Sequence, residues 1–241
     1  MEELHLGDCF GPTGLVTLED DSVDHLVTDP PYSEHVHKAV RTSRLVHEQG
    51  PARNVELGFA HITDEDRRRL AEQAARLVRR WSLIFSDIEG ISPWVYALEA
   101  VGLQHVRTMI WRRLDATPQF SGDRPASSCE AIVLCHRPGK KRWNGGGKHG
   151  FYAAAVVQNC GRTLDGARVH PTQKPLSLMA ALIRDFTDTG ELIVDPFAGS
   201  ATTLVAAKRL GRRALGWERD ELFYQRGCKR IDEAKEQLSL L

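Results

Sequence analysis

Residues 191–218 read ELIVDPFAGSATTLVAAKRLGRRALGWE, which predicts a strand, a tight turn, a helix and a second strand. We expect the first strand over Glu191 to Asp195, the helix over Ala201 to Leu210 and the second strand over Arg213 to Glu218. Alternation of this kind is typical of a parallel sheet whose strands are joined by covering helices.

The same alternation runs through the rest of the chain. It predicts an α/β fold with a mostly parallel sheet covered by helices on both faces. In this architecture ligands bind beyond the carboxyl ends of the strands. Thr63 is a candidate N-cap, and Arg79 and Arg80 suit the last turn of the helix that Thr63 begins. The other expected strands are 22–28, 81–86, 103–111 and 130–136, and the other expected helices are 63–80, 92–101, 176–187 and 220–237.

Length and composition predict one soluble domain over residues 1–241. The N-terminus lacks the pattern of a signal peptide, and the longest apolar run, 153–157, is too short to cross a membrane. The five cysteines form no C-x-x-C pair, so we expect reduced thiols in the cytoplasm and no cysteine-bound zinc. Net charge is zero, but residues 101–170 contain eleven Lys or Arg against four acids. This asymmetry indicates either a polyanion-binding face or a solvated patch.

The sharpest local signal is Asp29-Pro30-Pro31-Tyr32, directly after the strand 22–28. Two prolines fix the backbone and remove two N–H donors, which leaves the carbonyls of Asp29 and Pro30 without local competition. Asp29 adds acceptor oxygens, and Tyr32 adds an aromatic face. An exocyclic amino group on a base needs two acceptors and a stacking partner, which this tetrapeptide offers. The alternative is a turn that only ends a strand.

A second signal lies in the turn of residues 195–202. Its small residues permit close approach of a ligand, and the helix start offers N–H groups to a carboxylate. The turn is neither a dinucleotide fingerprint nor a phosphate-binding loop, which favours an amino-acid-like ligand. Glu218 ends the next strand, where an acid often binds ribose hydroxyls. The segment His170-Pro-Thr-Gln-Lys-Pro175 can supply further polar groups before the helix 176–187.

Together these segments resemble the DNA amino-methyltransferases of the β arrangement, in which the D-P-P-Y motif precedes the cofactor turn. Asp29 to Tyr32 stands before Asp195 to Ser200, as that order requires, and 170–175 resembles the family's signature upstream of the turn. Gly7-Asp8 and residues 128–134 are similar to two further motifs, although Cys129 stands where an aromatic residue or His is more usual. Ala201 replaces a glycine that is common in the turn.

The resemblance implies a Rossmann-like methyltransferase fold with a single, mixed, mainly parallel sheet of about seven strands. It also implies S-adenosylmethionine as cofactor and no metal. It implies catalysis by the tetrapeptide Asp29, Pro30, Pro31 and Tyr32 on N6 of an adenine flipped out of double-stranded DNA. N4 of cytosine remains the first alternative, and RNA or protein glutamine a more distant one. A homodimer and a role in restriction–modification stay open. The residues implied for the cofactor are Asp8, Asp29, His170, Thr172, Lys174, Asp195, Phe197, Ala198, Gly199, Ser200, Thr202 and Glu218.

DNA recognition is expected in a short insertion at about residues 137–169. So short a segment indicates limited base contacts, help from a partner subunit, or recognition shared with residues 33–60. Its basic residues are candidates for phosphate contacts, and its tryptophan is a candidate wedge between bases or simply a packed loop residue. The residues concerned are Arg137, Lys140, Lys141, Arg142, Trp143 and Lys148.

Overall fold

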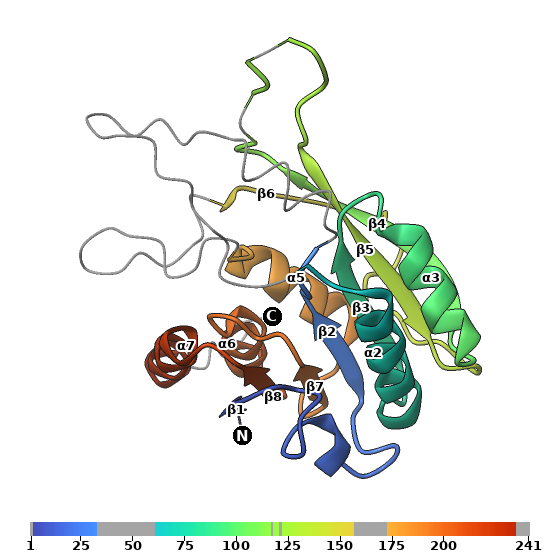
Figure 1. Cartoon of the computed structure of the whole chain (residues 1–241), viewed down its shortest axis with the longest axis vertical. Coiled ribbons are helices and arrows are strands. Elements are labelled where there is room, and N and C mark those ends of the chain that lie inside the picture. Colours follow the sequence, from blue (N-terminus) through green and yellow to red (C-terminus); the bar gives the residue numbers. More distant parts are fainter. Residues whose placement is uncertain (1, 33–60, 117, 121, 157–172, 235–241) are drawn as a thin grey trace.

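The computed structural model of the chain describes residues 2–32, 61–116, 118–120, 122–156 and 173–234. Eight strands form one sheet in the order β1-β8-β7-β2-β3-β5-β4-β6 (Figure 1). The strands are β1 (Glu2–Leu6), β2 (His25–Thr28), β3 (Trp81–Ser86), β4 (Gln104–Arg113), β5 (Cys129–His136), β6 (Phe151–Ala154), β7 (Leu192–Asp195) and β8 (Arg213–Glu218).

The sheet is mixed and mainly parallel, as the sequence predicts, but it has eight strands instead of about seven. The two strands that the sequence pattern does not reveal, β1 and β6, lie at the two ends of the sheet. Each buries a single residue, Leu4 in β1 and Ala154 in β6, so neither carries the apolar run of a central strand.

Strand direction defines two edges of the sheet. Of the strands in the described residues, only β5 runs antiparallel to its neighbours. We call the edge at which the seven parallel strands end the carboxyl edge and the opposite one the amino edge. Because β5 is reversed, its first residues lie at the carboxyl edge, where Ala131 pairs with Ser86, and its last residue pairs with Trp81 at the amino edge.

Two connections leave adjacent strands in opposite directions. From β7 the chain continues to β8 on one side, and from β2 it continues to β3 on the other. The boundary between β7 and β2 is therefore a topological switch point, where open α/β sheets bind their ligands. Thr28, at the end of β2, donates from Oγ1 to Asp195 Oδ1 at the end of β7 over 2.7 Å. The switch point thus holds a buried hydrogen bond between its two strands.

Helices cover both faces of the sheet, and successive residues of the central strands point to opposite faces. Leu26 and Ile84 belong to one buried cluster with α2 and α3, whereas their neighbours Val27 and Leu83 belong to the other with α5 and α6. The helices are α2 (Asp64–Leu77), α3 (Ile91–Ala100), α5 (Leu176–Phe186), α6 (Thr202–Arg209) and α7 (Glu221–Glu233), with a short 3-10 turn η1 (Leu15–Thr17).

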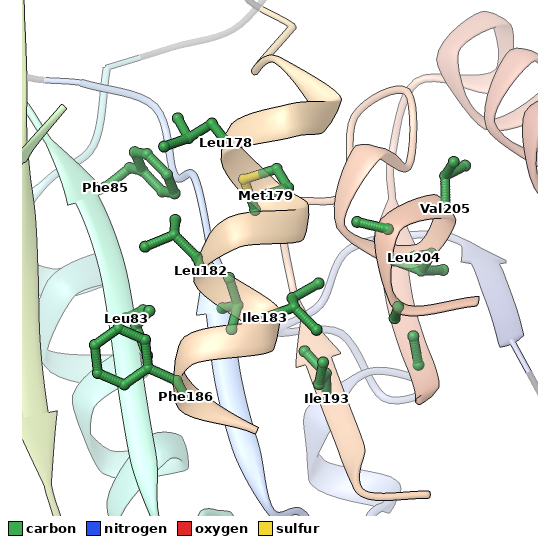
Figure 2. Packing of buried hydrophobic residues seen from close by; sticks show 14 of the residues in the cluster. Leu83, Phe85, Leu178, Met179, Leu182, Ile183, Phe186, Ile193, Leu204 and Val205 are labelled. Carbon is green, nitrogen blue, oxygen red and sulfur yellow. The ribbon is translucent and has the colours of Figure 1, made fainter. Parts of the chain in front are cut away.

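The core under α5 is packed from side chains of three elements. Figure 2 shows Leu182 and Phe186 of α5 directed toward Leu83 of β3, and Leu204 of α6 beside the same helix. Leu182 and Leu204 are fully buried. This packing holds α5 against β3, so that the start of the helix lies near the carboxyl edge.

Helix α2 begins at the predicted residue and ends earlier than predicted. The Thr63 hydroxyl accepts from the backbone N–H of Asp66, and the Asp66 carboxylate accepts from Thr63 N, which completes a capping box. The helix ends at Leu77 instead of Arg80, because Arg79 N donates to Val23 O and leaves the helical path. None of the helices in the described ranges is long and apolar enough to cross a membrane.

Candidate active site

The carboxylate of Asp29 lies directly after β2 at the carboxyl edge. Its Oδ2 atom accepts a hydrogen bond from Lys174 Nζ over 2.7 Å. The ammonium group is almost completely buried, with 7% of the side chain exposed, and the Asp29 side chain is 22% exposed. The structure thus brings together two residues that are 145 positions apart in the sequence.

The second carboxylate at this site belongs to Glu130, at the start of β5. Lys174 Nζ lies 3.1 Å from Glu130 Oε2, and the Tyr32 hydroxyl donates to the same oxygen. Tyr32 OH also accepts from Lys174 Nζ over 3.0 Å. Asp29, Tyr32, Glu130 and Lys174 therefore form one polar cluster, which we call the lysine cluster. Glu130 was not predicted as a site residue.

Burial and charge determine the protonation of the lysine cluster. Burial raises the pKa of Asp29, and the Lys174 ammonium partly offsets this effect, so that the pKa stays above its ordinary value. Burial alone would lower the pKa of Lys174, but the negative charges of Asp29 and Glu130 outweigh it and hold that pKa above the ordinary value. Lysine is thus kept as ammonium. Burial also raises the pKa of Tyr32 far above its usual range, which keeps the phenol neutral.

One oxygen of Asp29 has no hydrogen-bond partner among the residues that the structure describes. This atom, Oδ1, is buried, whereas Oδ2 is bound by Lys174. A buried carboxylate oxygen without a donor is costly, because it loses its water and gains nothing in exchange. Such an atom is expected where a ligand supplies the donor. Pro30, which follows, is buried and has no N–H of its own.

The turn of residues 195–202 lies at the switch point beside Asp29. Asp195 Oδ1 accepts from Thr28 Oγ1 and from Phe197 N, and only 3% of Asp195 is exposed. Burial raises the pKa of Asp195 to about 6. Gly199 and Ala201 both have positive φ, of 53° and 60°, so the chain turns sharply before α6. Ala201 adopts this conformation in spite of its Cβ, which shows that the position does not require glycine.

Acidic groups of two further strands lie next to this turn. Glu218 ends β8, accepts from Gly199 N and has a pKa raised by burial. Gly7 N donates to Glu218 O, which places Asp8 beside it. The carboxylates of Asp8, Asp195 and Glu218 suit a ligand that carries an ammonium group and ribose hydroxyls. The chemistry of these residues therefore fits S-adenosylmethionine, the cofactor expected from the sequence.

Aromatic and small side chains complete the surroundings of the turn. The Phe197 ring meets Phe10 edge to face with 6.1 Å between centroids, a neighbour that the sequence did not reveal. Ser200 and Thr202, two predicted cofactor residues, present their hydroxyls to Arg230 of α7, at 2.9 and 3.2 Å. These hydroxyls therefore brace the turn against α7.

Three sequence predictions fall wholly or partly outside the described residues. His170 and Thr172, two of the expected cofactor residues, lie there, as do residues 33–60 and the later part of the expected insertion. Of the segment 170–175, the structure describes residues 173–175, and among these Lys174 is placed in the lysine cluster.

The first part of the predicted DNA-binding cluster lies at the amino edge, away from Asp29, whereas Lys148 precedes β6, which pairs with the last residues of β4. Arg137 follows β5 and forms an ion pair with Asp21, and Lys141 Nζ donates to Gln104 at the start of β4. β3 spans six residues, so the two edges are roughly 17 Å apart. Because β5 is antiparallel, it carries the chain from Glu130 toward the amino edge, so Arg137 and Lys141 lie away from Asp29. That this cluster contacts DNA phosphates stays a prediction.

The remaining members of that cluster are held by residues near the end of α5. Arg142 pairs with Asp188 at 3.1 Å, and Lys148 with Asp185 at 2.7 Å. Lys140, beside Lys141, is exposed. Trp143 packs edge to face on Phe186, with 4.6 Å between centroids, and donates from Nε1 to Gly146 O. The tryptophan is therefore packed against α5 in this structure, which favours the packed-loop alternative over the wedge.

The sheet is mixed and mainly parallel, and its switch point carries the turn of residues 195–202 and the buried acceptor Asp29 Oδ1. This arrangement is typical of Rossmann-like enzymes, which bind their ligand at the switch point. The chain matches the DNA methylase family (N6_N4_Mtase) over residues 23–228 and belongs to that family. It is thus a DNA methyltransferase that uses S-adenosylmethionine.

Known relatives cover most of the chain. The Type II methyltransferase M.HinfI of Haemophilus influenzae is 25% identical over 250 residues, which are 95% of this chain and 68% of the relative. The Type II methyltransferase M2.DpnII of Streptococcus pneumoniae is 26% identical over 249 residues, 92% of this chain and 87% of the relative.

Solved structures confirm the predicted fold class. The M1.HpyAVI complex with S-adenosylmethionine has a TM-score of 0.69 at 23% identity and covers 96% of this chain and 100% of its own. PvuII DNA methyltransferase, described as cytosine-N4-specific, has a TM-score of 0.74 at 16% identity and covers 98% and 88%. Likeness at this level of identity shows a shared fold.

Proposed function

We propose that this protein is a site-specific methyltransferase of the β arrangement that methylates N6 of an adenine flipped out of double-stranded DNA. The observation that carries the proposal is Asp29 Oδ1, a buried acceptor without a partner among the described residues, next to the switch point. A flipped adenine would supply the missing donor through its exocyclic amino group. Membership of the DNA methylase family supports the choice of DNA as substrate.

The residues after β2 would bind and orient the amino group. Asp29 Oδ1 and the Pro30 carbonyl accept its two hydrogens, which fixes the nitrogen lone pair in one direction and raises its electron density. The Tyr32 ring stacks on the base, while its hydroxyl stays bound to Glu130. S-adenosylmethionine, when bound, supplies an electrophilic methyl group. Burial of Asp29 and Lys174 excludes water from the acceptor side of this site.

The other carboxylates would hold the cofactor. Asp195 suits its ammonium group, Glu218 its ribose hydroxyls and Asp8 a further polar group, since all three lie at adjacent strand ends. The backbone from Phe197 to Gly199 permits close approach. Lys174 was also predicted to bind the cofactor, but Asp29, Glu130 and Tyr32 already accept its three N–H donors. We therefore assign to Lys174 the positioning of Asp29 and Tyr32.

DNA would approach the carboxyl edge. The segment between β4 and β5 extends beyond that end of the sheet (Figure 1), and Phe120 in it is 86% exposed. An exposed aromatic ring can stack on an unpaired base.

Adenine is favoured by the Asp at the first position of the tetrapeptide, since in similar enzymes Asp usually accompanies adenine and Ser cytosine. The fold is shared with a cytosine-N4-specific enzyme, and the two-acceptor geometry serves N4 of cytosine equally well. N4 of cytosine is therefore the alternative target. The Type II relatives support a site-specific enzyme of restriction–modification.

Transfer of a tritiated methyl group to duplex DNA, RNA or protein tests the proposal. We expect label in DNA alone. Asp29→Ala should abolish transfer and leave S-adenosylmethionine affinity within about tenfold by calorimetry, because the cofactor is held mainly by other strands. Substantial residual activity in this variant would contradict the role of Asp29.

A further inference from the structure

Glu130 lies in the active site but belongs to none of the segments that bind the base or the cofactor. It lies at the start of β5, which is at the carboxyl edge because that strand runs antiparallel to its neighbours. Its side chain is only 14% exposed, and its Oε2 atom receives both the Tyr32 hydroxyl and Lys174 Nζ. Burial of a charged carboxylate is unfavourable unless other groups pair with it, so the contacts of Glu130 are the ones that explain its position.

Lys174 has three N–H donors, and the lysine cluster supplies an acceptor for each. They are Asp29 Oδ2 at 2.7 Å, Tyr32 OH at 3.0 Å and Glu130 Oε2 at 3.1 Å. The rings of Tyr32, Phe85 and Trp111 surround the ammonium, with Nζ 5.0, 5.1 and 5.7 Å from their centroids. Aromatic faces stabilise a cation. The ammonium is therefore held in one position and cannot turn toward Asp29 Oδ1.

Two carboxylates share one ammonium in this cluster, and each change of charge has a distinct effect on Asp29. If Glu130 were neutral, Lys174 would pair with Asp29 alone and weaken it as an acceptor. If Lys174 were neutral, Asp29 and Glu130 would repel each other, and one of them would take up a proton. In the complete cluster Lys174 is shared between the two carboxylates and binds Asp29 through Oδ2, which leaves Asp29 Oδ1 free among the described residues.

We propose that Glu130 is a positioning residue for methyl transfer, which holds Lys174 and Tyr32 so that Asp29 offers a free acceptor oxygen and Tyr32 a fixed ring face. This inference rests on the proposed function, because it deepens the role of the same site. Glu130 acts through Lys174 and Tyr32 and does not itself touch the reacting atoms.

Charged and titratable groups face Asp29 from several elements. Tyr32 follows the same strand, Glu130 belongs to β5, Lys174 precedes α5 and Asp195 ends β7. Arg113 of β4 lies behind Glu130, with Nε 4.0 Å from Oε1. Exchange of Glu130 or Lys174 changes the charge next to Asp29 and leaves Asp195 and Arg113 in place.

The first experiment measures the pKa of Asp29 in the ligand-free protein by carbon-13 NMR of labelled aspartate, with Asp29→Asn for assignment. We expect Glu130→Gln to lower this pKa and Lys174→Met to raise it, each by about one unit or more. The double variant should return toward the wild-type value, because the repulsion and the attraction are removed together. Glu130→Asp keeps the charge and should lie closest to wild type.

Asp185→Asn is the matched control. Asp185 is also a buried carboxylate bound by a lysine and a tyrosine, Lys148 at 2.7 Å and Tyr152 at 3.0 Å, but it belongs to α5, and among the described residues no hydrogen bond or ion pair joins it to the lysine cluster. We expect this variant to leave the pKa of Asp29 unchanged. A merely structural role of Glu130 predicts no opposite shifts. Unchanged Asp29 titration, or shifts of the same sign in Glu130→Gln and Lys174→Met, would overturn the proposal.

The second experiment follows methyl transfer to duplex DNA against pH. We expect Glu130→Gln to lower kcat at least tenfold with an unchanged KM for S-adenosylmethionine, and the acid limb of kcat to move with the Asp29 pKa in both single variants. An acid limb that stays fixed while the pKa moves would contradict the proposal. If the wild-type protein transferred no methyl group to DNA, the proposed function would fail, and the NMR result would still decide the electrostatic role of Glu130.

Discussion

The hydrogen bond between Thr28 and Asp195 joins the two strands of the switch point, and Thr28→Val removes it with little change of shape. Thr28 is fully buried, and its Oγ1 lies 2.7 Å from a carboxylate that is 3% exposed. A hydrogen bond to a charged group contributes about 1.5–3 kcal/mol, and one between neutral groups about 1 kcal/mol. The loss should therefore depend on whether Asp195 is ionised.

The pKa of Asp195, raised by burial to about 6, sets the pH range of this dependence. Because the folded pKa lies above the unfolded value, ionisation of Asp195 costs stability as pH rises from about 4 to 6, and the cost is complete above that range. At pH 8 the carboxylate is charged, and we expect Thr28→Val to lower the free energy of unfolding by about 2 kcal/mol. At pH 5 the group is mostly protonated, and the loss should fall to about 1 kcal/mol.

Urea unfolding followed by tryptophan fluorescence at pH 5 and pH 8 measures both values. Thr28→Ser is the matched control, since it keeps the hydroxyl and loses one buried methyl group, at a cost of about 1 kcal/mol that should not depend on pH. Equal losses at the two pH values for Thr28→Val would refute the argument that Asp195 is a buried carboxylate supported by this bond.

Three further predictions concern the carboxyl edge, around Asp195 and Gly216, and the amino edge, around Lys140 and Lys141. Calorimetry should show that the Kd for S-adenosylmethionine is constant above pH 7 and increases below pH 6. Protonation of Asp195, whose pKa is about 6, removes a negative charge that attracts the ammonium group of the cofactor. Asp195→Asn should make the Kd independent of pH in this range. Gly216→Val should lower the free energy of unfolding by about 1–3 kcal/mol, because a Cβ at this position would lie 3.1 Å from Asp195 O. Gly147→Ala is the control, since a Cβ there meets no atom within 4 Å, and it should leave the melting temperature unchanged. Lys140→Glu with Lys141→Glu should leave the salt dependence of DNA binding unchanged, and a shallower slope, by about 0.9 per lost contact, would show that DNA reaches the amino edge.

The central elements of the fold could be predicted because each carries a clear periodic pattern. α5 begins at the predicted Leu176 and ends one residue before the predicted Thr187, and α6 and β8 agree similarly well. The edge strands β1 and β6 could not, since pairing on one side and a single buried residue leave no apolar pattern.

The position of a candidate site residue could be predicted where the residue ends or directly follows a recognisable apolar strand. Asp29 and Asp195 follow apolar strands and lie at the carboxyl edge as expected. The role of Glu130 depends on the direction of β5, which sequence alone did not give. A charged residue at the start of a strand that is otherwise apolar was the available signal, and an antiparallel β5 turns that residue toward Asp29.

The same reversal determines where the expected DNA-binding cluster lies. Residues after His136 leave the sheet at the amino edge, so the basic residues that directly follow β5 lie away from Asp29. Local charge indicates that a segment is solvated or binds an anion, but it carries no information about which edge of the sheet it occupies.

Digestion of methylated DNA to nucleosides, followed by mass spectrometry, tests the central claim most directly. Duplex DNA incubated with the protein and S-adenosylmethionine should yield N6-methyladenine, and Asp29→Ala should yield none. N4-methylcytosine as the main product would contradict the assignment of adenine. A product methylated at carbon, or no methylated nucleoside at all, would contradict the account of Asp29 as the acceptor for an exocyclic amino group.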